Sequence, residues 1–154
     1  MILALDTSIW IDLLRRKDAG VVARFSEMAL AQAPMVVPAL VLHELETGLI
    51  AGRSSERRRV QLGALLAQCS AIDFSADDAR VSGELRARLR LAGTPIGEID
   101  TLIAGQALAR GWTVVTRNVR HFGRVKDLAL IDWSEGPEPL TVGRIAARVA
   151  EGGA

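Results

Sequence analysis

Five short β-like runs alternate with longer helical patterns along this chain, and that alternation constrains the fold more than any other feature. The runs lie at residues 2–5, 35–37, 71–74, 113–115 and 128–131. Strands separated by helical segments predict βαβ units. We therefore expect an α/β fold built on a parallel sheet that helices cover on both faces.

Length and composition indicate a single domain. A chain of 154 residues can bury a sufficient core without disulfides. Its longest apolar stretch, MALAQAPMVVPALVL, is interrupted by Gln32, Pro34 and Pro38, so it is too short to span a membrane. The N-terminus carries no export pattern, and the single cysteine, Cys69, has no partner for an internal disulfide. We therefore expect a cytoplasmic protein without a membrane segment.

The charged residues leave the type of partner open. All but two of the 19 basic residues are Arg, which suits planar contacts to phosphate groups. A GC-rich coding sequence explains the same bias. The net charge of +1 argues against a basic surface over the whole molecule.

An aspartate ends the first β run, in the stretch LDTSIW. Asp6 follows residues 2–5, and Ser8 lies two positions further on. In a parallel sheet this point is the carboxyl edge, where ligands bind. Asp6 equally suits a cap for the helical pattern that follows it, so a role in a site depends on other acids at the same edge.

Glu44 falls on the apolar stripe of the helix predicted over residues 38–49. The other members of the stripe are Val41, Leu45 and Gly48, and Glu46 points the other way. An acid on such a face is costly unless it pairs with a cation or binds a metal ion. Either an Arg side chain or a metal ion would satisfy Glu44.

Asp100 repeats this situation in the stretch TPIGEIDTLIAGQAL. It shares a helical face with Ile96, Ile103 and Ala107, and Glu98 lies opposite. Because Asp100 is close to the start of its helix, the helix dipole also favours a carboxylate there. A structural role and a role in a site are both open.

A fourth polar position, Asn118, follows the β run that ends before Thr116 in VVTRNVRHF. A turn or a helix cap explains Asn118 as well as a site does. If these positions meet at one edge, Asp6, Glu44, Asp100 and Asn118 form an all-oxygen cluster suited to Mg²⁺ or Mn²⁺. A metal ion held in this way activates water and neutralises a phosphoryl group.

Competing motifs are incomplete. The stretch HELET begins like a zinc-protease motif, but Thr47 occupies the position of the second histidine. The chain contains neither the GxxxxGK nor the GxGxxG loop. With only His43 and His121 available, a serine or cysteine triad has little support.

Four stretches, LDTSIW, VVPALVLHELETGL, GTPIGEIDTLIAGQAL and VVTRNVRHF, occur in an order and spacing that resemble PIN-domain ribonucleases. More narrowly, they are similar to the VapC-type toxins of bacterial toxin–antitoxin modules. The resemblance covers residues 1–133 and implies a three-layer α/β/α sandwich with a five-stranded parallel sheet. It also implies an endoribonuclease that depends on Mg²⁺ or Mn²⁺, a cognate antitoxin protein as partner, and a homodimer.

The resemblance places the first three acids of the family on Asp6, Glu44 and Asp100. The family often has a fourth acid in the stretch matching TRNVRHF, where this chain has Asn118 and His121. Asn118 would coordinate through its amide oxygen or hold a water. Residues 134–154, expected to form a linker and a short helical tail with Val142, Ile145 and Val149 on one face, extend past the usual end of such toxins.

In the expected mechanism, the three acids hold one or two metal ions, and a metal-activated water hydrolyses the RNA phosphodiester bond. Ser8, Thr116 and Asn118 position water or substrate. Candidate phosphate contacts, each equally explained as part of a solvated face, are Arg86, Arg90, Arg117, Arg120 and Arg124.

Two alternatives remain at this stage. The first is a catalytically weak RNA-binding module that a partner protein regulates, in which the missing fourth acid has removed useful metal affinity. The second is a metal-dependent nuclease acting on DNA or on flap structures. Metal titration separates the first from an active ribonuclease, and oligonucleotides without a 2′-hydroxyl separate the second.

Overall fold

The computed structural model describes residues 1–152 and contains one five-stranded sheet in that range. All neighbouring strands pair in parallel, in the spatial order β3-β2-β1-β4-β5. The strands are β1 (Leu3–Leu5), β2 (Met35–Pro38), β3 (Ser70–Ile72), β4 (Thr113–Val115) and β5 (Ala129–Ile131). The predicted parallel α/β fold is therefore confirmed, and each strand lies within two residues of its predicted ends.

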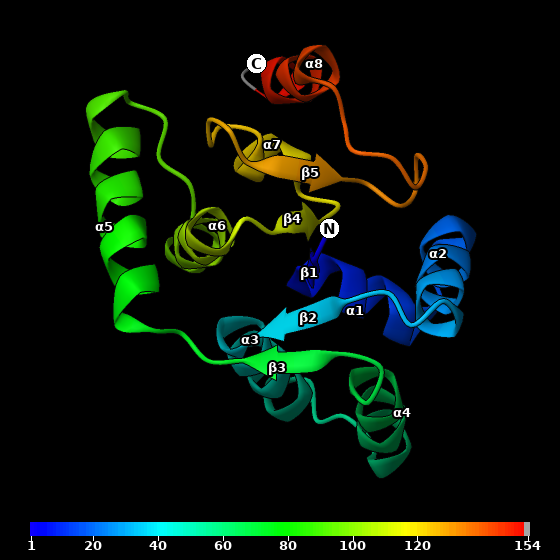
Figure 1. The fold of residues 1–154 in the computed structure, drawn as a ribbon. Coiled ribbons are helices and arrows are strands. Elements are labelled where there is room, and N and C mark those ends of the chain that lie inside the picture. The colour runs from blue at the N-terminus through cyan, green and yellow to red at the C-terminus, as the bar shows by residue number, and fades with distance from the viewer. Residues whose placement is uncertain (153–154) are drawn as a thin grey trace.

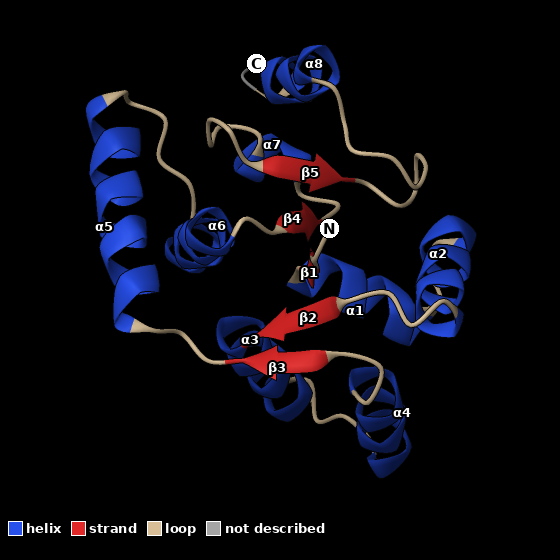
Figure 2. Cartoon of the chain, in the orientation of Figure 1, coloured by secondary structure: helices blue, strands red, loops and turns tan. Residues whose placement is uncertain are grey.

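Helices connect the strands and flank the sheet (Figure 1). Figure 2 shows the strands at the centre of the molecule with helices around them. Within the described residues the helices are α1 (Thr7–Arg15), α2 (Ala19–Leu30), α3 (Ala39–Ala51), α4 (Glu56–Leu66), α5 (Ala76–Leu91), α6 (Glu98–Arg110), α7 (Val119–Phe122) and α8 (Val142–Glu151).

Local signals in the sequence explain several helix boundaries. Ser75 and Asp78 form a capping box at the start of α5, in which each side chain accepts a hydrogen bond from the backbone of the other. Gly111 ends α6 in the left-handed region, which glycine adopts without steric cost. Asp18 and Ser55 cap α2 and α4, for which the sequence analysis had proposed no bounds.

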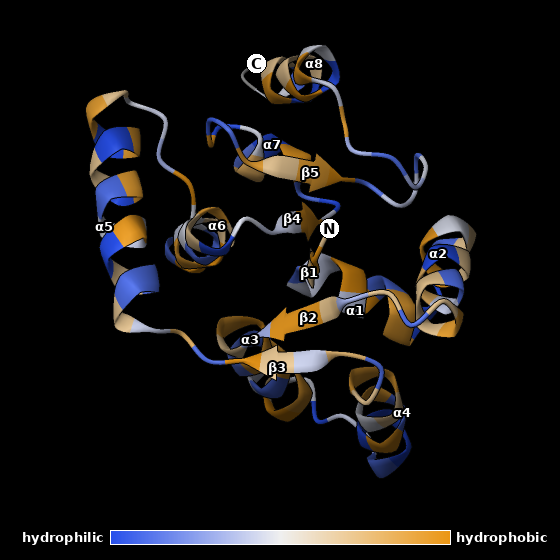
Figure 3. Cartoon of the chain, viewed as in Figure 1, coloured by the Kyte–Doolittle hydropathy of each residue, from blue (hydrophilic) through white to orange (hydrophobic). Residues whose placement is uncertain are grey.

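The core lies between the sheet and its helices. β1, β2 and β4 are buried along their whole length, whereas the edge strand β3 is largely exposed. Figure 3 accordingly shows β2 in hydrophobic colours and the outer helix α5 with mixed polarity. Trp10 is fully buried, packs edge-on against Phe25 and donates a hydrogen bond to the carbonyl of Leu5, so its indole nitrogen is satisfied.

The central register brings two strand ends together. Leu5 of β1 pairs with Val115 of β4, so the residues that follow them, Asp6 and Thr116, are neighbours at the carboxyl edge of the sheet. Figure 1 shows α6, whose first turn contains Asp100, between β4 and the outer helix α5. The topology therefore assembles the candidate site from segments that are about a hundred residues apart in sequence.

A buried ion pair joins α5 to α6. Arg110 donates two hydrogen bonds to the carboxylate of Asp78, from Nε to Oδ1 at 3.0 Å and from Nη2 to Oδ2 at 2.7 Å. Gln106 donates a third bond to Asp78. These contacts hold the helix that carries Asp100 against its outer neighbour.

The C-terminal helix α8 packs on α7, at the top of the view in Figure 1. Ile145 and Val149 are half-buried there, but Val142 is 85% exposed. Of the three residues predicted to share one face of this helix, Ile145 and Val149 are therefore partly buried, and Val142 lies at the first position of α8. In residues 1–152, no helix is long and apolar enough to cross a membrane.

Candidate active site

Asp6 lies at the carboxyl edge of the sheet with 3% of its surface exposed. Two hydroxyl groups donate to its Oδ2 atom, Thr116 Oγ1 at 2.8 Å and Ser8 Oγ at 2.9 Å. Asp6 occupies the N-cap position of α1, but its side chain makes no capping hydrogen bond. The capping interpretation of Asp6 is therefore wrong: the carboxylate serves the sheet edge and not the helix.

Burial raises the pKa of the Asp6 carboxyl above its ordinary value. The hydrogen bonds from Thr116 and Ser8 lower the pKa, and the negative charge of Asp100 raises it. The charge of Asp100 therefore acts on the Asp6 carboxyl in the same direction as burial, and its effect is smaller. Such a pair of acids has an electrostatic cost that a cation bound beside them would remove.

Asp100, half-buried in the first turn of α6, is held by two residues of the TRNVRHF stretch. Its Oδ2 atom accepts from Asn118 Nδ2 at 3.2 Å and lies 3.0 Å from His121 Nδ1. Asn118 makes no side-chain cap to α7. In this arrangement the amide nitrogen of Asn118 donates to Asp100, and coordination of a metal ion by its amide oxygen stays a prediction.

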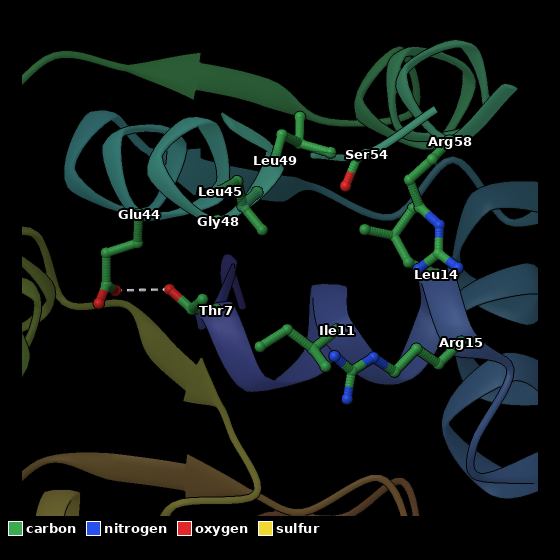
Figure 4. Close-up of a pocket in the computed structure, with 10 residues that line it drawn as sticks. All are labelled: Thr7, Ile11, Leu14, Arg15, Glu44, Leu45, Gly48, Leu49, Ser54 and Arg58. Carbon is green, nitrogen blue, oxygen red and sulfur yellow. Dashed lines mark hydrogen bonds between the residues drawn. The ribbon is translucent and has the colours of Figure 1, made fainter. Parts of the chain in front are cut away.

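Glu44 is half-buried on α3 and accepts a hydrogen bond at Oε1 from the hydroxyl of Thr7, at 2.6 Å. Figure 4 shows this contact at one end of a pocket between α1, α3 and α4. Glu46, which was expected to point away, is exposed and pairs with Arg59. Gly48 is also exposed, although it was expected to share the apolar face of Glu44.

The three acids share one feature of their hydrogen bonding. Every side-chain hydrogen bond that the structure describes to them falls on a single oxygen of each carboxylate: Oδ2 of Asp6, Oε1 of Glu44 and Oδ2 of Asp100. One oxygen of each acid is thus fixed in place. In the described part of the chain, the second oxygen has no side-chain donor.

The metal-binding capacity of these acids has two aspects. Their oxygen donors are the type that hard divalent cations prefer. Among residues 1–152, however, no three His, Cys, Asp or Glu side chains are gathered closely enough to hold a metal ion. Asp6 and Asp100 interact, whereas Glu44 is engaged by Thr7. The donor set therefore fits a divalent cation chemically, with Asp6 and Asp100 as its assembled part.

The segment 116–118 contacts both Asp6 and Asp100 and so connects the two acids. Thr116 is fully buried, and its hydroxyl accepts from the backbone nitrogen of Asn118 at 2.8 Å while it donates to Asp6. The backbone nitrogen of Arg117 donates to Ser8 Oγ at 3.0 Å. Ser8 and Thr116 therefore lie at the site, as the sequence analysis predicted, although their role toward substrate stays a prediction.

The five arginines expected to contact phosphate have different surroundings. Arg86 pairs with Glu98 and lines a pocket together with Arg90. Arg120 is exposed on α7, and Arg124 donates to the carbonyl of Pro95 at 2.9 Å. The Arg117 guanidinium instead lies against three carboxylates: Asp12 at 2.9 Å, Asp18 at 3.4 Å and Asp132 at 3.5 Å.

Sequence reasoning assigned no site role to Thr7 or to the acids around Arg117. The available signal for Thr7 was its place beside Asp6 in LDTSIW. Asp12 and Asp132 gave no such signal. They are separated by more than a hundred positions, and only the fold brings them to Arg117.

Comparisons with known proteins agree with this geometry. The sequence profile of the PIN domain family matches residues 3–128. The chain is 36% identical over 130 residues to a tRNA(fMet)-specific endonuclease VapC of Shigella flexneri, which covers 84% of this chain and 96% of the relative. It is 32% identical to ribonuclease VapC2 of Rickettsia felis over 88% of this chain and 100% of the relative.

Solved structures show the same similarity. The structure of VapBC2 from Rickettsia felis bound to a DNA fragment from its promoter superposes with a TM-score of 0.78 at 31% identity, over 85% of this chain and 98% of that one. DNA-bound VapBC from Salmonella typhimurium gives the same TM-score and identity, over 86% and 98%.

This chain therefore belongs to the PIN-domain family and, within it, to the VapC-type ribonuclease toxins. The predicted PIN-like α/β/α sandwich is confirmed. Nucleases of this family generally depend on a divalent metal ion.

Proposed function

We propose that this protein is an endoribonuclease that uses Mg²⁺ or Mn²⁺ at Asp6, Glu44 and Asp100, and that it acts as the toxin of a toxin–antitoxin module. The observation that carries the proposal is the one-sided hydrogen bonding of the three acids. Carboxylates that are fixed through one oxygen keep the other for a ligand. The mutual repulsion of Asp6 and Asp100 gives a cation an energetic reason to bind.

A divalent metal ion bound to these acids would lower the pKa of a water molecule and offset charge on a phosphate. The residues of the chain supply the alignment. Thr116 and Ser8 hold the Asp6 carboxylate in one orientation, and Asn118 and His121 do the same for Asp100. Asn118 therefore supports the site by orienting an acid, in the position where relatives often carry a further one.

The proposed substrate is RNA. The similarity to an endonuclease named for tRNA(fMet) makes initiator tRNA the first substrate to examine. Arg86 and Arg90 lie one turn apart on α5 and line a pocket with Glu98 of α6, the helix that carries Asp100. We assign phosphate contacts to these two arginines, with Arg120 and Arg124 as further candidates on the opposite side of α6.

The proposed partner is a cognate antitoxin protein, because solved structures similar to this chain are VapBC toxin–antitoxin complexes. The sequence analysis also predicted a homodimer and a cytoplasmic location, and both remain proposals.

The decisive experiment is cleavage of initiator tRNA and total RNA by the antitoxin-free protein with Mg²⁺ or Mn²⁺, beside an EDTA control. We expect discrete products with metal that disappear with EDTA. Asp100→Asn should reduce the rate by about 100-fold or more, the scale for removing one preorganised charged group. Glu46→Gln, the control that removes a charge from another helix, should leave the rate within about threefold, because Glu46 is exposed, pairs with Arg59 and points away from the site.

Other outcomes would identify the alternatives. Metal-independent RNA binding without cleavage by any divalent ion would overturn the enzyme assignment and favour the RNA-binding module. Equal cleavage of DNA oligonucleotides would favour the broader nuclease. Equal rates for Asp100→Asn and Glu46→Gln would refute the site.

A further inference from the structure

The side chain of Arg117 lies next to the candidate site but points into an acidic enclosure. Asp12 of α1, Asp18 before α2 and Asp132 after β5 surround its guanidinium. Asp132 has only 1% of its side chain exposed, and Asp12 has 10%. Because three carboxylates balance its charge, the Arg117 guanidinium has little capacity to bind a phosphate. The role of Arg117 therefore concerns the chain segment to which it belongs.

The backbone of Arg117 contributes directly to the site. Its N–H donates to Ser8 Oγ at 3.0 Å, and Ser8 donates to Asp6. The residues on either side, Thr116 and Asn118, contact Asp6 and Asp100 respectively. Holding the side chain of Arg117 therefore fixes the segment that makes two direct contacts to the acids and a third bond to Ser8.

The buried carboxylate of Asp132 connects this segment to the C-terminal helix. Arg117 Nε lies 3.5 Å from Asp132 Oδ1, and Arg148 Nη2 of α8 lies 3.6 Å from Asp132 Oδ2. Ser134 donates two further hydrogen bonds to Asp132, from its backbone nitrogen and its hydroxyl. A carboxylate buried between two guanidinium groups loses more from the removal of either one than an exposed pair does.

A second contact joins α8 to the other side of the site. At Gly123, which ends α7, an added Cβ would lie 2.8 Å from a methyl group of Ile145 and 2.8 Å from one of Val149. Only glycine permits this close approach. α7 carries His121, which contacts Asp100, so α8 supports both the segment before α7 and α7 itself.

We propose that α8 orders the segment 116–118 against Asp6 and Asp100, with Arg148 as a positioning residue that acts through Asp132 and Arg117. Arg148 lies beyond residues 3–128, which match the PIN-domain family profile, and beyond residues 1–133, over which the chain resembles the family. The C-terminal helix of this chain is thus an added support of the site. The inference rests on the proposed function only in that the segment ordered by α8 contacts two of the proposed metal ligands.

The test compares two arginines of α8. Arg148 and Arg144 both pair with Glu135, but only Arg148 also reaches Asp132. Arg148→Gln and Arg144→Gln therefore remove the same charge from the same helix. In the first measurement, NMR monitors amide hydrogen exchange at Arg117 and Asn118 in the full-length protein without metal.

Arg148→Gln should accelerate exchange at both amides by about tenfold, because their partners Ser8 and Thr116 are no longer held in register. Arg144→Gln should leave both rates unchanged. Arg148→Lys, which keeps the charge, should restore most of the protection, and it also serves as the test variant if Arg148→Gln does not fold. Equal exchange in the Arg148 and Arg144 variants would overturn the proposal, whatever happens to overall stability.

Mn²⁺ affinity of the same proteins, measured by calorimetry, is the second measurement. Arg148→Gln should weaken Mn²⁺ binding by about tenfold, the lower range for changes to residues that orient metal ligands. If the wild-type protein bound no Mn²⁺, the proposed function would fail, while the exchange rates would still decide whether α8 orders the segment. The two failures are therefore distinguishable.

Discussion

Replacing Thr116 with valine tests how the fold tolerates a buried acid at its sheet edge. Valine has nearly the same shape, so the change removes the hydroxyl without creating a cavity. Thr116 is fully buried, and its hydroxyl donates to Asp6 at 2.8 Å and accepts from the backbone nitrogen of Asn118 at 2.8 Å. We expect Thr116→Val to destabilise the metal-free protein.

The magnitude follows from the two lost bonds. A hydrogen bond to a charged group contributes about 1.5–3 kcal/mol, and a buried amide left without an acceptor costs about 1–3 kcal/mol. Because Asn118 is only half-buried, water can reach its amide, and the lower end applies to that second contribution. The free energy of unfolding should therefore fall by about 3 kcal/mol, which corresponds to a shift of about 1.5–2 M in the urea midpoint.

The pH dependence separates the two contributions. Burial raises the pKa of Asp6, so ionised Asp6 costs the folded state stability, and the cost appears as the pH rises through the folded-state pKa. Without the Thr116 hydroxyl this pKa rises further. The difference between wild type and variant should thus be largest at neutral pH and should shrink as the pH falls below the folded-state pKa of Asp6.

Urea denaturation in EDTA at several pH values measures this effect. Thr47→Val is the control, because the hydroxyl of Thr47 is exposed and donates to a carbonyl of its own helix. The control should change stability by less than about 0.5 kcal/mol. Equal effects of the two substitutions at neutral pH, or a penalty at Thr116 that does not vary with pH, would refute the role of this hydroxyl toward Asp6.

Two further predictions concern the support of α6. Gly105→Ala should destabilise the protein by about 2 kcal/mol in urea denaturation, because the new Cβ would lie 2.5 Å from the backbone Cα of Ser82. Gly83→Ala, with open space around the new Cβ, should stabilise the protein by about 0.5–1 kcal/mol. A change of the same sign in both variants would contradict this prediction. Arg110 holds the pKa of Asp78 well below its usual range, so this pair contributes stability that is complete above the unfolded-state pKa of about 4 and is lost as the pH falls further. Arg110→Met should cost about 3 kcal/mol at neutral pH and flatten the acid limb of the stability profile, and an unchanged acid limb would argue against the pair.

Much of the fold could be predicted because it depends on local patterns. The five strands follow from short apolar runs, and Ser75 and Gly111 mark helix ends through their own side chain or backbone freedom. The order of the strands could not be read from these patterns, since most of the runs are apolar on both faces and compatible with several neighbours. The register between Leu5 and Val115, which creates the site, is a property of the assembled sheet.

The site was only partly accessible from sequence for a similar reason. An acid on an apolar stripe signals a need for a partner without naming it. In the structure the side chain of Asp100 contacts Asn118 and His121, whereas Glu44 accepts a hydrogen bond from the hydroxyl of Thr7. Arg117 illustrates the opposite case, in which a residue that looked available for phosphate is enclosed by acids distant in sequence.

The contrast between two buried aspartates explains why one is a candidate for catalysis and the other is not. Asp78 is neutralised by the two-pronged contact from Arg110, so burial there stabilises the fold and leaves no unmet charge. Asp6 accepts hydrogen bonds from two neutral hydroxyl groups and from the backbone of Thr7, and the charge of Asp100 raises its pKa. Since neutral donors orient a carboxylate without neutralising its charge, the ionised form of Asp6 has an electrostatic cost in the fold that a proton or a bound cation relieves.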